Sequence, residues 1–318
     1  MQNINNILKK INKLKILVVG DIMLDKYIWG DIKRISQEAP IPIINVNSKS
    51  YNIGGAGNVA SNLVGLGAKV SIAGVIGQDQ ESQIISNFFK KQNIDDSMVL
   101  SFPKRETTLK ARYLSKSQQI FRVDSETSTP LLLDEKTKLF EKIKLNINKY
   151  NGIIIESYDK GLIDLWLIKN LLKLSKELNI PIYVDPKRKN FFDFLGVQFF
   201  KPNIKEISEA LKKNVDKSNI EQIGIELRKK INCSVLLITQ GPDGMSLFDE
   251  NGFHQIPTKA KSVHDVSGAG DTVISVFVAA NLCGADNKLS TELSNFAAGK
   301  VCEQIGVYSI KKEDLKSF

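Results

Sequence analysis

Residues 264–276, HDVSGAGDTVISV, place three small residues directly before a carboxylate and then turn apolar. Gly268, Ala269 and Gly270 let the backbone approach a ligand closely, and the first amides of a helix favour negative charge. Asp271 beside such a phosphate pocket suits a base that takes a proton from a hydroxyl attacking the phosphate. An acidic residue in the first turn of an ordinary helix accounts for the same stretch equally well.

Polar residues also follow several other apolar runs. Each segment alone is weak evidence, because Asp, Gly and Asn are common turn residues. Ligands of α/β proteins nevertheless sit beyond the carboxyl ends of the strands, so an ordered series of such segments predicts one shared site. The segments are 20-GDIMLD-25, 53-IGGAGNVASNL-63, 185-DPK-187, 201-KPNIKE-206 and 239-TQGPDG-244.

Short apolar runs that alternate with amphipathic stretches must position these residues. Apolar residues recur at helical spacing in residues 163–179 and 219–232. Continuous apolar strands between helices predict a mostly parallel sheet covered on both faces, an α/β fold with three α/β/α layers. The strand-like runs are residues 15–20, 69–77, 152–156, 181–185, 197–203 and 234–241.

Two segments, at about 26–52 and 104–126, break this alternation. Both show polar–apolar alternation and lack helical periodicity, which predicts a small antiparallel sheet inserted into the α/β domain. A mobile lid over a cleft is the natural use of such an insert. A structural or dimer-forming ribbon is the alternative, and the two uses are compatible.

The composition excludes several functional classes. The 318 residues carry a net charge of +9, but the lysines are scattered and form no basic stripe with interleaved aromatics, so we expect no nucleic-acid partner. No apolar run approaches the ~20 residues of a membrane span. Three distant cysteines in apolar contexts make a disulfide framework improbable and favour a reducing cytoplasm, and two histidines are too few for a His-rich metal site.

The chain resembles the ribokinase-like (PfkB) family of carbohydrate kinases from Lys15 to about Ile310. The most specific segment is 265-DVSGAGD-271, which is similar to the family signature D-[VT]-[ST]-G-A-G-D. Within the family it looks most like the kinases that phosphorylate D-glycero-β-D-manno-heptose 7-phosphate at its anomeric hydroxyl, on the route to ADP-heptose and lipopolysaccharide. Further segments carry this likeness: 34-RISQEAPIPI-43, 54-GGAGNVASNL-63, 118-QQIFRVD-124 and 185-DPK-187.

The resemblance implies roles on the nucleotide side. Asp271 would be the general base for the sugar O1 hydroxyl, with Gly268, Ala269 and Gly270 as the anion hole for the transferring phosphoryl group. Asn203 and Glu206 resemble an N-x-x-E motif that organises Mg²⁺, through water, and the phosphates of ATP. The implied nucleotide-loop and adenine residues are Thr239, Gly241, Gly244 and Asn295, and Asp265 and Ser267 match a monovalent-cation (K⁺) site of some relatives.

The resemblance also implies a sugar side. Asp25, Gly54, Gly55 and Asn58 match positions that bind hydroxyl groups. The 7-phosphate requires cations, and a solvated surface charge is the equal alternative for each candidate. The candidates are Lys110, Arg112 and Arg122 on the lid, and Lys187.

Two departures from the family pattern stand out. Gln37 replaces a proline, and Ser157, in 156-ESYDKG-161, stands where relatives carry an aspartate, which puts substrate affinity or specificity in doubt. Another sugar or nucleoside kinase, such as a ribokinase or fructokinase, and a non-catalytic sugar-phosphate sensor remain alternatives. A nicotinamide dehydrogenase does not fit, because 74-GVIGQD-79 lacks G-x-G-x-x-G.

The resemblance finally implies partners and a domain plan. We expect one kinase domain over residues 1–318 with no C-terminal nucleotidylyltransferase domain, because no H-x-G-H motif occurs. A separate adenylyltransferase would then act downstream. We expect a cytoplasmic homodimer joined through the lid sheets.

Overall fold

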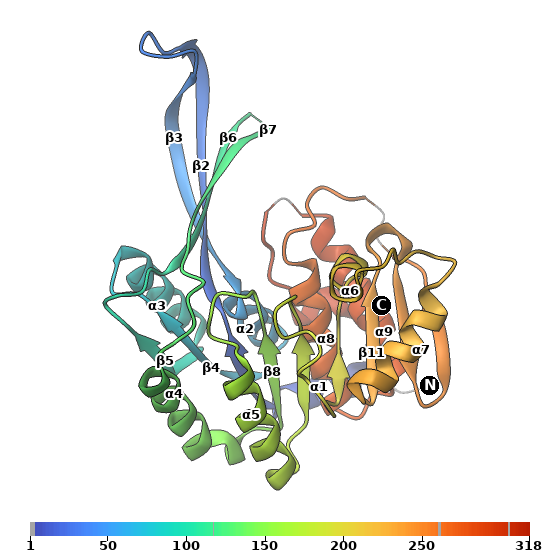
Figure 1. Ribbon diagram of the computed structural model, residues 1–318. Helices are drawn as coiled ribbons and strands as arrows, with labels where there is room; N and C mark the ends of the chain where they lie inside the picture. The colour runs from blue at the N-terminus through green and yellow to red at the C-terminus, as the bar shows by residue number, and fades with distance from the viewer. Residues whose placement is uncertain (1–3, 117, 260–261, 305) are drawn as a thin grey trace.

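The apolar runs form the nine-stranded sheet at the centre of the computed structural model, which describes residues 4–116, 118–259, 262–304 and 306–318 (Figure 1). The strand order is β13-β12-β11-β10-β9-β8-β1-β4-β5, and β11, β12 and β13 pair antiparallel while the remaining neighbours are parallel. The strands are β1 (Lys15–Gly20), β4 (Lys69–Ile76), β5 (Asp95–Ser101), β8 (Gly152–Glu156), β9 (Ile182–Asp185), β10 (Phe199–Phe200), β11 (Val235–Thr239), β12 (Met245–Asp249) and β13 (Gly252–Ile256).

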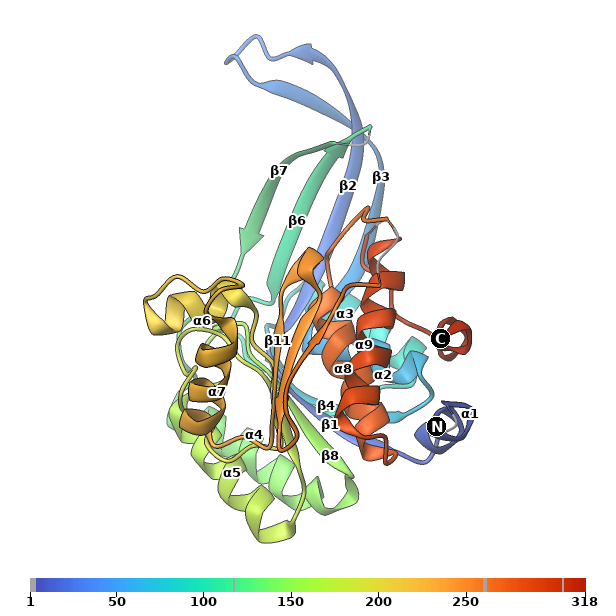
Figure 2. The ribbon, with the colours of Figure 1, turned by 90° about the vertical axis from the view of Figure 1, so that its right-hand side faces the viewer.

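Helices cover both faces of this sheet, which confirms the predicted three layers (Figure 2). Side chains alternate along β1, so that Ile16 and Val18 enter one core and Leu17 and Val19 the other. The first core packs against α1 (Ile4–Ile11), α2 (Ala56–Gly65), α3 (Gln80–Gln92), α8 (Ala269–Leu282) and α9 (Asn287–Cys302). The second packs against α4 (Leu133–Asn146), α5 (Leu165–Leu178), α6 (Ile204–Leu211) and α7 (Ile220–Ile231).

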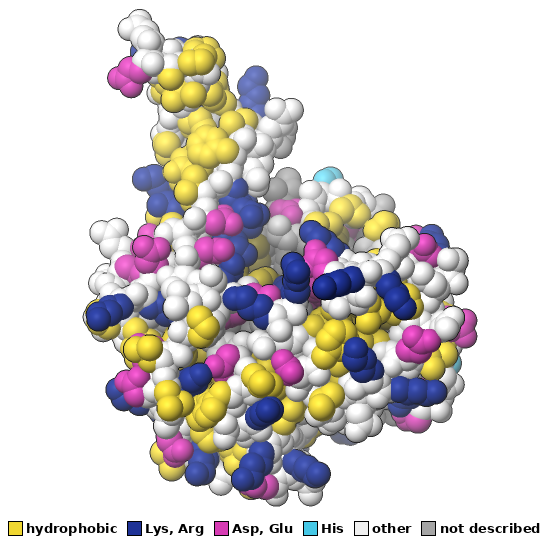
Figure 3. Space-filling model, in the orientation of Figure 1, with side chains coloured by type: hydrophobic (Ala, Val, Ile, Leu, Met, Phe, Trp, Pro, Cys, Tyr) yellow, Lys and Arg dark blue, Asp and Glu magenta, His cyan; other side chains and the backbone are white. Residues whose placement is uncertain are grey.

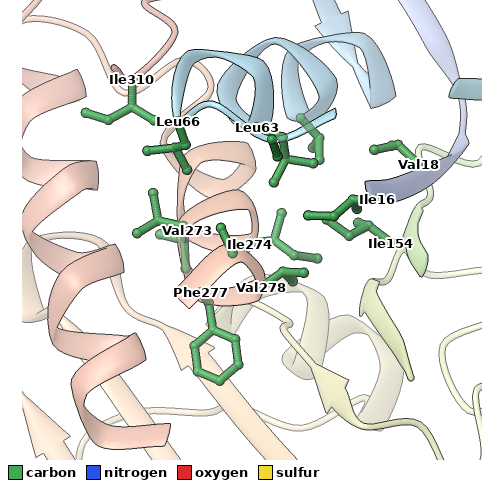
Figure 4. Packing of buried hydrophobic residues seen from close by; sticks show 14 of the residues in the cluster. Ile16, Val18, Leu63, Leu66, Ile154, Val273, Ile274, Phe277, Val278 and Ile310 are labelled. Carbon is green, nitrogen blue, oxygen red and sulfur yellow. The ribbon is translucent and has the colours of Figure 1, made fainter. Parts of the chain in front are cut away.

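Helix α8 is buried on all sides. Val273, Ile274 and Val278 pack among residues of β1, β8 and α2 (Figure 4), and the ring of Phe277 stacks on Phe199 with centroids 3.9 Å apart. A helix that is apolar all round needs such an enclosed position. It therefore holds its first turn, with Asp271, at a fixed point of the molecule. Among the described residues, no helix is both long and apolar enough to cross a membrane.

The inserted segments form a separate four-stranded sheet with the order β3-β2-β6-β7. Its strands are β2 (Ile22–Ile35), β3 (Pro42–Gly55), β6 (Thr108–Ser115) and β7 (Gln118–Ser125). Both hairpins are antiparallel, as predicted, but β2 and β6 pair parallel where they meet. The sheet projects from the body, and the β2–β3 hairpin reaches beyond β6 and β7 (Figures 1 and 2).

The lid strands differ from the expected boundaries. β2 begins at Ile22 and β3 ends at Gly55, so both continue into the body beyond the expected 26–52. The reason is that Asp21 alone separates β2 from β1, which leaves no loop at the root of the lid. Position 117, within the expected second segment, lies outside the described residues. The three cysteines are free and buried, in agreement with the predicted lack of a disulfide framework.

Candidate active site

The glycine-rich turn before α8 has the close packing that its composition predicts. Gly268 caps the helix at φ 79°, a left-handed conformation that favours glycine, and an added Cβ would lie 2.6 Å from Nδ2 of Asn58. The amide of Ala269 already donates to the carbonyl of Val266 at 3.2 Å. The predicted anion hole of three residues therefore has one amide engaged within the turn.

Asp271 is buried in the first turn of α8 and both of its carboxylate oxygens accept hydrogen bonds. Asn58 donates from Nδ2 to Oδ2 at 2.7 Å, and the hydroxyl of Tyr158 donates to Oδ1 at 3.0 Å. Burial is the largest influence and raises the pKa of Asp271 to about 6, against the two hydrogen bonds, which lower it. A carboxylate with that pKa is ionised at neutral pH and basic enough to accept a proton.

A cluster of buried carboxylates surrounds Asp271. Oxygens of Glu156, Asp185 and Asp271 lie within 4.8 Å of one another, and Lys201 pairs with Asp185 at 2.6 Å. Burial, followed by the charges of Asp185 and Asp271, raises the pKa of Glu156 well above its usual value. Both oxygens of Glu156 and Oδ1 of Asp185 find no hydrogen-bond donor among the described residues. Unpartnered hard oxygens with excess negative charge fit a hard divalent cation such as Mg²⁺.

The larger cavity at this end of the sheet, about 620 Å³, brings the predicted nucleotide residues together. This volume lies within the range of small-molecule sites. Figure 3 shows the surface hollowed between the base of the lid and the body, with basic side chains nearby. The cavity is lined by Asn203, Glu206, Thr239, Gly241, Gly244 and Asn295, and by Gly268, Ala269, Gly270 and Asp271.

Asn203 and Glu206, the residues of the N-x-x-E motif, also cap the N-terminus of α6. Oδ1 of the Asn203 side chain accepts the backbone N–H of Glu206 at 2.8 Å. The backbone N–H of Asn203 in turn donates to Oε2 of Glu206, also at 2.8 Å. This is a capping box, so the motif has a structural use besides its predicted role with Mg²⁺. Glu206 also forms an ion pair with Lys187. Lys187 lines the larger, nucleotide-side cavity and not the smaller cavity that contains the other predicted sugar-side residues.

Two further predicted nucleotide-side residues, Asn295 and Asp265, hold loops of the site through hydrogen bonds to the backbone. Asn295 donates from Nδ2 to the carbonyl of Pro257 at 2.6 Å, which holds the loop that follows β13. Asp265 accepts the amide hydrogens of Ser267, at 2.8 Å, and of Gly306, at 3.2 Å. The predicted monovalent-cation residues thus close a turn in front of α8.

A smaller cavity of about 140 Å³ adjoins the first at the root of the lid. Asp25 and Arg112 form an ion pair across β2 and β6, and burial lowers the pKa of Lys110 beside them. Arg122, by contrast, is half exposed on β7, pairs with Asp124 at 2.9 Å and lines neither cavity. The predicted sugar-side residues that do line this cavity are Asp25, Gly54, Gly55, Asn58, Lys110 and Arg112.

The sequence analysis assigned no role to four residues of this site: Tyr158, Glu156, Asp185 and Lys201. Glu156 and Asp185 end β8 and β9 as register partners, and Lys201 follows β10 directly. The strand-end segments 185-DPK-187 and 201-KPNIKE-206 already contained Asp185 and Lys201, and the same rule would have found Glu156 at the end of β8. Ser157, where an aspartate was expected, is buried and lines neither cavity.

Comparisons with known proteins find a matching family and similar sequences. The profile of the pfkB family of carbohydrate kinases matches residues 13–314. The bifunctional protein HldE of Geobacter metallireducens is 34% identical over 316 residues, which cover 99% of this chain and 64% of that protein. HldE of Helicobacter pylori is 37% identical over 293 residues, 92% of this chain and 63% of that protein. The chain thus spans less than two thirds of these relatives.

Solved structures show the same fold at low identity. Ribokinase of Arabidopsis thaliana, complexed with ribose and ATP, superposes with a TM-score of 0.75 at 17% identity, over 96% of this chain and 98% of that one. Phosphofructokinase-2 of Escherichia coli reaches a TM-score of 0.80 at 16% identity, over 96% and 98%. The expected ribokinase-like fold is confirmed.

Proposed function

The chain belongs to the pfkB family of carbohydrate kinases, and from that premise we propose that it phosphorylates D-glycero-β-D-manno-heptose 7-phosphate at O1, with ATP as donor. The observation that carries this proposal is the position of Asp271, which lines both cavities. A base at the junction of a nucleotide cavity and a sugar cavity reaches the hydroxyl that attacks the phosphate. Identity of 34–37% to bifunctional HldE proteins over nearly the whole chain supports the choice of subgroup.

The proposed reaction uses Asp271 as the general base. Its carboxylate takes the proton of the O1 hydroxyl while that oxygen forms a bond to the γ-phosphorus. The bond between the γ-phosphorus and the bridging oxygen breaks, and its electron pair leaves with ADP. The backbone of Gly268 and Gly270, at the positive end of α8, would stabilise the negative charge of the transferring group.

The larger cavity would hold ATP and Mg²⁺. Glu206 is proposed to reach the metal through water, and the unpartnered oxygens of Glu156 and Asp185 give the site further hard donors. Mg²⁺, when bound, would neutralise charge on the phosphates of ATP. Lys187 and Lys201 line the same cavity and supply positive charge on the protein's side. Thr239, Gly241, Gly244 and Asn295 are proposed to contact the nucleotide. We also propose that K⁺ binds near Asp265 and Ser267.

The cations of the lid favour a substrate that itself carries a phosphate. Lys110 and Arg112 line the smaller cavity, next to Asp25. Arg112 lies opposite Arg122 in the β6–β7 register, and their charges are balanced by ion pairs with Asp25 and Asp124. A bound sugar phosphate would add a second anion between the two arginines, with Arg122 swinging in from its exposed position. Asp25, Asn58 and the backbone of the Gly54–Gly55 turn would then bind sugar hydroxyls.

We also propose that two copies associate through their lids. The outer part of the β2–β3 hairpin exposes Ile35 at 60%, Ile41 at 57% and Val46 at 49% of their surfaces, and exposed apolar side chains gathered on one element are typical of interaction sites. The arm appears as a largely hydrophobic surface in Figure 3. Because the HldE relatives are bifunctional, we propose that an adenylyltransferase acts on the product of this kinase.

The substrate proposal is tested with a panel of acceptors and ATP-Mg: β- and α-heptose 7-phosphate, ribose, fructose 6-phosphate and adenosine. Preferential use of the β-heptose phosphate, with product at O1, is the expected result. Activity on another acceptor would keep Asp271 as the base and move the specificity to a different sugar or nucleoside kinase. Binding of the sugar phosphate without turnover would favour a non-catalytic sensor.

A further inference from the structure

Tyr158 occupies the boundary between the two cavities. Of the described residues, three line both the 620 Å³ and the 140 Å³ cavity: Tyr158, Gly268 and Asp271. The hydroxyl of Tyr158 donates to Oδ1 of Asp271 at 3.0 Å. A phenol that is hydrogen-bonded to the base and touches both cavities is placed to influence the reaction without itself transferring the proton.

The backbone holds this tyrosine in place. Its amide donates to Oδ2 of buried Asp21 at 2.7 Å, and the amide of Lys160 donates to the same oxygen at 3.2 Å. Asp21 lies between β1 and β2, directly at the root of the lid. The loop that carries Tyr158 is therefore anchored to the carboxyl end of β1, in the interior of the central sheet. This leaves the ring little freedom to move away from Asp271.

Two ammonium groups, one from each cavity, also lie close to the ring of Tyr158. Nζ of Lys110, from the sugar side, is 5.3 Å from the ring centroid, and Nζ of Lys187, from the nucleotide side, is 5.1 Å from it. Both distances are within the range of cation–π attraction. These contacts involve the ring and would survive loss of the hydroxyl, so the ring's packing and the hydroxyl's role can be separated by experiment.

We propose that Tyr158 is a positioning residue for the base: its hydroxyl holds Asp271 in the orientation that lines both cavities. This inference rests on the proposed function of Asp271. Asn58 secures the opposite oxygen, at 2.7 Å, so the two donors together fix the plane of the carboxylate. Charges of both signs face Asp271 and Tyr158 from the surrounding elements and would pull an unsupported carboxylate out of this orientation. They are Glu156 from β8, Asp185 from β9, Lys201 after β10, Lys187 after β9 and Lys110 from the lid.

The test compares Tyr158→Phe with Tyr183→Phe. Tyr183 is a matched control, because its buried hydroxyl donates to Asn281 at 3.0 Å and its change also removes one hydroxyl from a packed ring. The loss of a hydrogen bond to a charged group corresponds to an effect of about 10- to 100-fold. For Tyr158→Phe we therefore expect kcat to fall by about 10- to 100-fold with little change in the KM of either substrate, whereas Tyr183→Phe should keep the wild-type kcat.

A second readout does not depend on finding the sugar. The infrared stretching band of the Asp271 carboxylate, assigned as the band lost in Asp271→Asn, should shift in frequency in Tyr158→Phe, where Oδ1 has lost its donor, and stay unchanged in Tyr183→Phe. An unchanged band in Tyr158→Phe, or an equal shift in the control, would overturn the proposal. If the wild type phosphorylates no acceptor, the proposed function fails while this band still decides the role of Tyr158. ATP binding by both variants verifies that they are folded.

Discussion

Asn58 and Asp271 meet across 213 positions of sequence, with Nδ2 of the amide 2.7 Å from Oδ2 of the carboxylate. Asn58 lies in the first turn of α2 and Asp271 in the first turn of α8, and the two helices are packed against each other. Oδ1 of Asn58 is buried and has no donor among the described residues. The same side chain can therefore hold the base with one end and accept a sugar hydroxyl with the other.

Replacing Asn58 with alanine should weaken both functions of this side chain. We expect the KM for the sugar to rise and kcat to fall by about tenfold each, since a hydrogen bond to a charged group contributes about 1.5–3 kcal/mol. The KM for ATP should change little. Steady-state kinetics with each substrate varied would measure this. Ser61→Ala, a buried change on the same helix whose hydroxyl bonds to Gly57, is the control and should keep wild-type kinetics.

Asp271→Asn should lower turnover by about 10²–10⁴-fold, the usual contribution of a positioned acid–base group. ATP affinity should stay nearly unchanged, because the amide keeps the size of the carboxylate. Isothermal titration with ATP-Mg and single-turnover kinetics would separate the two effects. Asp249→Asn, a buried change at the end of β12, controls for general damage to the fold. Full turnover by Asp271→Asn would remove Asp271 from the role of base.

The pH dependence of the wild-type enzyme follows from the same residue. Burial raises the pKa of Asp271 to about 6, so its base form is present above that pH and is lost as the pH falls through it. We expect kcat/KM, which reports the pKa of the free enzyme, to decline about tenfold per unit below pH 6 and to level off above it. Measuring kcat as well, at saturating substrates, separates this decline from effects of protonation on substrate binding. A flat profile between pH 5 and 8 would contradict a base with this pKa.

The residues of the site that the sequence predicts best are those within one local segment. The turn before α8 is an example, because three small residues, an acid and an apolar run follow one another in residues 268–280. Tyr158 is different. Its contact with Asp271 joins residues 113 apart and depends on the order of β8, β9 and β1 in the sheet, which periodicity does not specify.

Lys187 and Arg122 show a second limit of the sequence. Both were predicted to bind the sugar phosphate because they are cations near the expected site. Lys187 pairs with Glu206 and Arg122 with Asp124, and binding of the sugar phosphate by these two residues stays a prediction. A long flexible side chain takes its direction from the nearest opposite charge, and that partner becomes known only when the chain is folded. The central strands, in contrast, follow from continuous apolar runs, which have few alternatives to a buried sheet.

Arg112→Gln should raise the KM for the sugar phosphate by about 10- to 100-fold, with a smaller change in kcat, because Arg112 lines the sugar cavity and a charge-assisted hydrogen bond contributes about 1.5–3 kcal/mol. The loss should be much smaller for a sugar that lacks the phosphate. Arg122→Gln, on the exposed face of β7, tests whether the facing arginine takes part: a comparable rise places it on the bound phosphate. Equal losses for phosphorylated and unphosphorylated sugars would show that Arg112 acts through Asp25 instead.

Ile41→Asp and Val46→Asp, singly and together, should convert the proposed dimer to a monomer without unfolding the body. Both side chains are exposed on the β2–β3 hairpin, so a charge costs little in the monomer but would be buried in a lid–lid interface. Sedimentation equilibrium over a range of concentrations measures the association directly. Leu145→Asp is the matched control, because Leu145 is 76% exposed on α4, away from the lid, and its change should leave association intact. A wild type that is monomeric at micromolar concentration, or a double variant that still dimerises, would show that the hairpin does not join two copies.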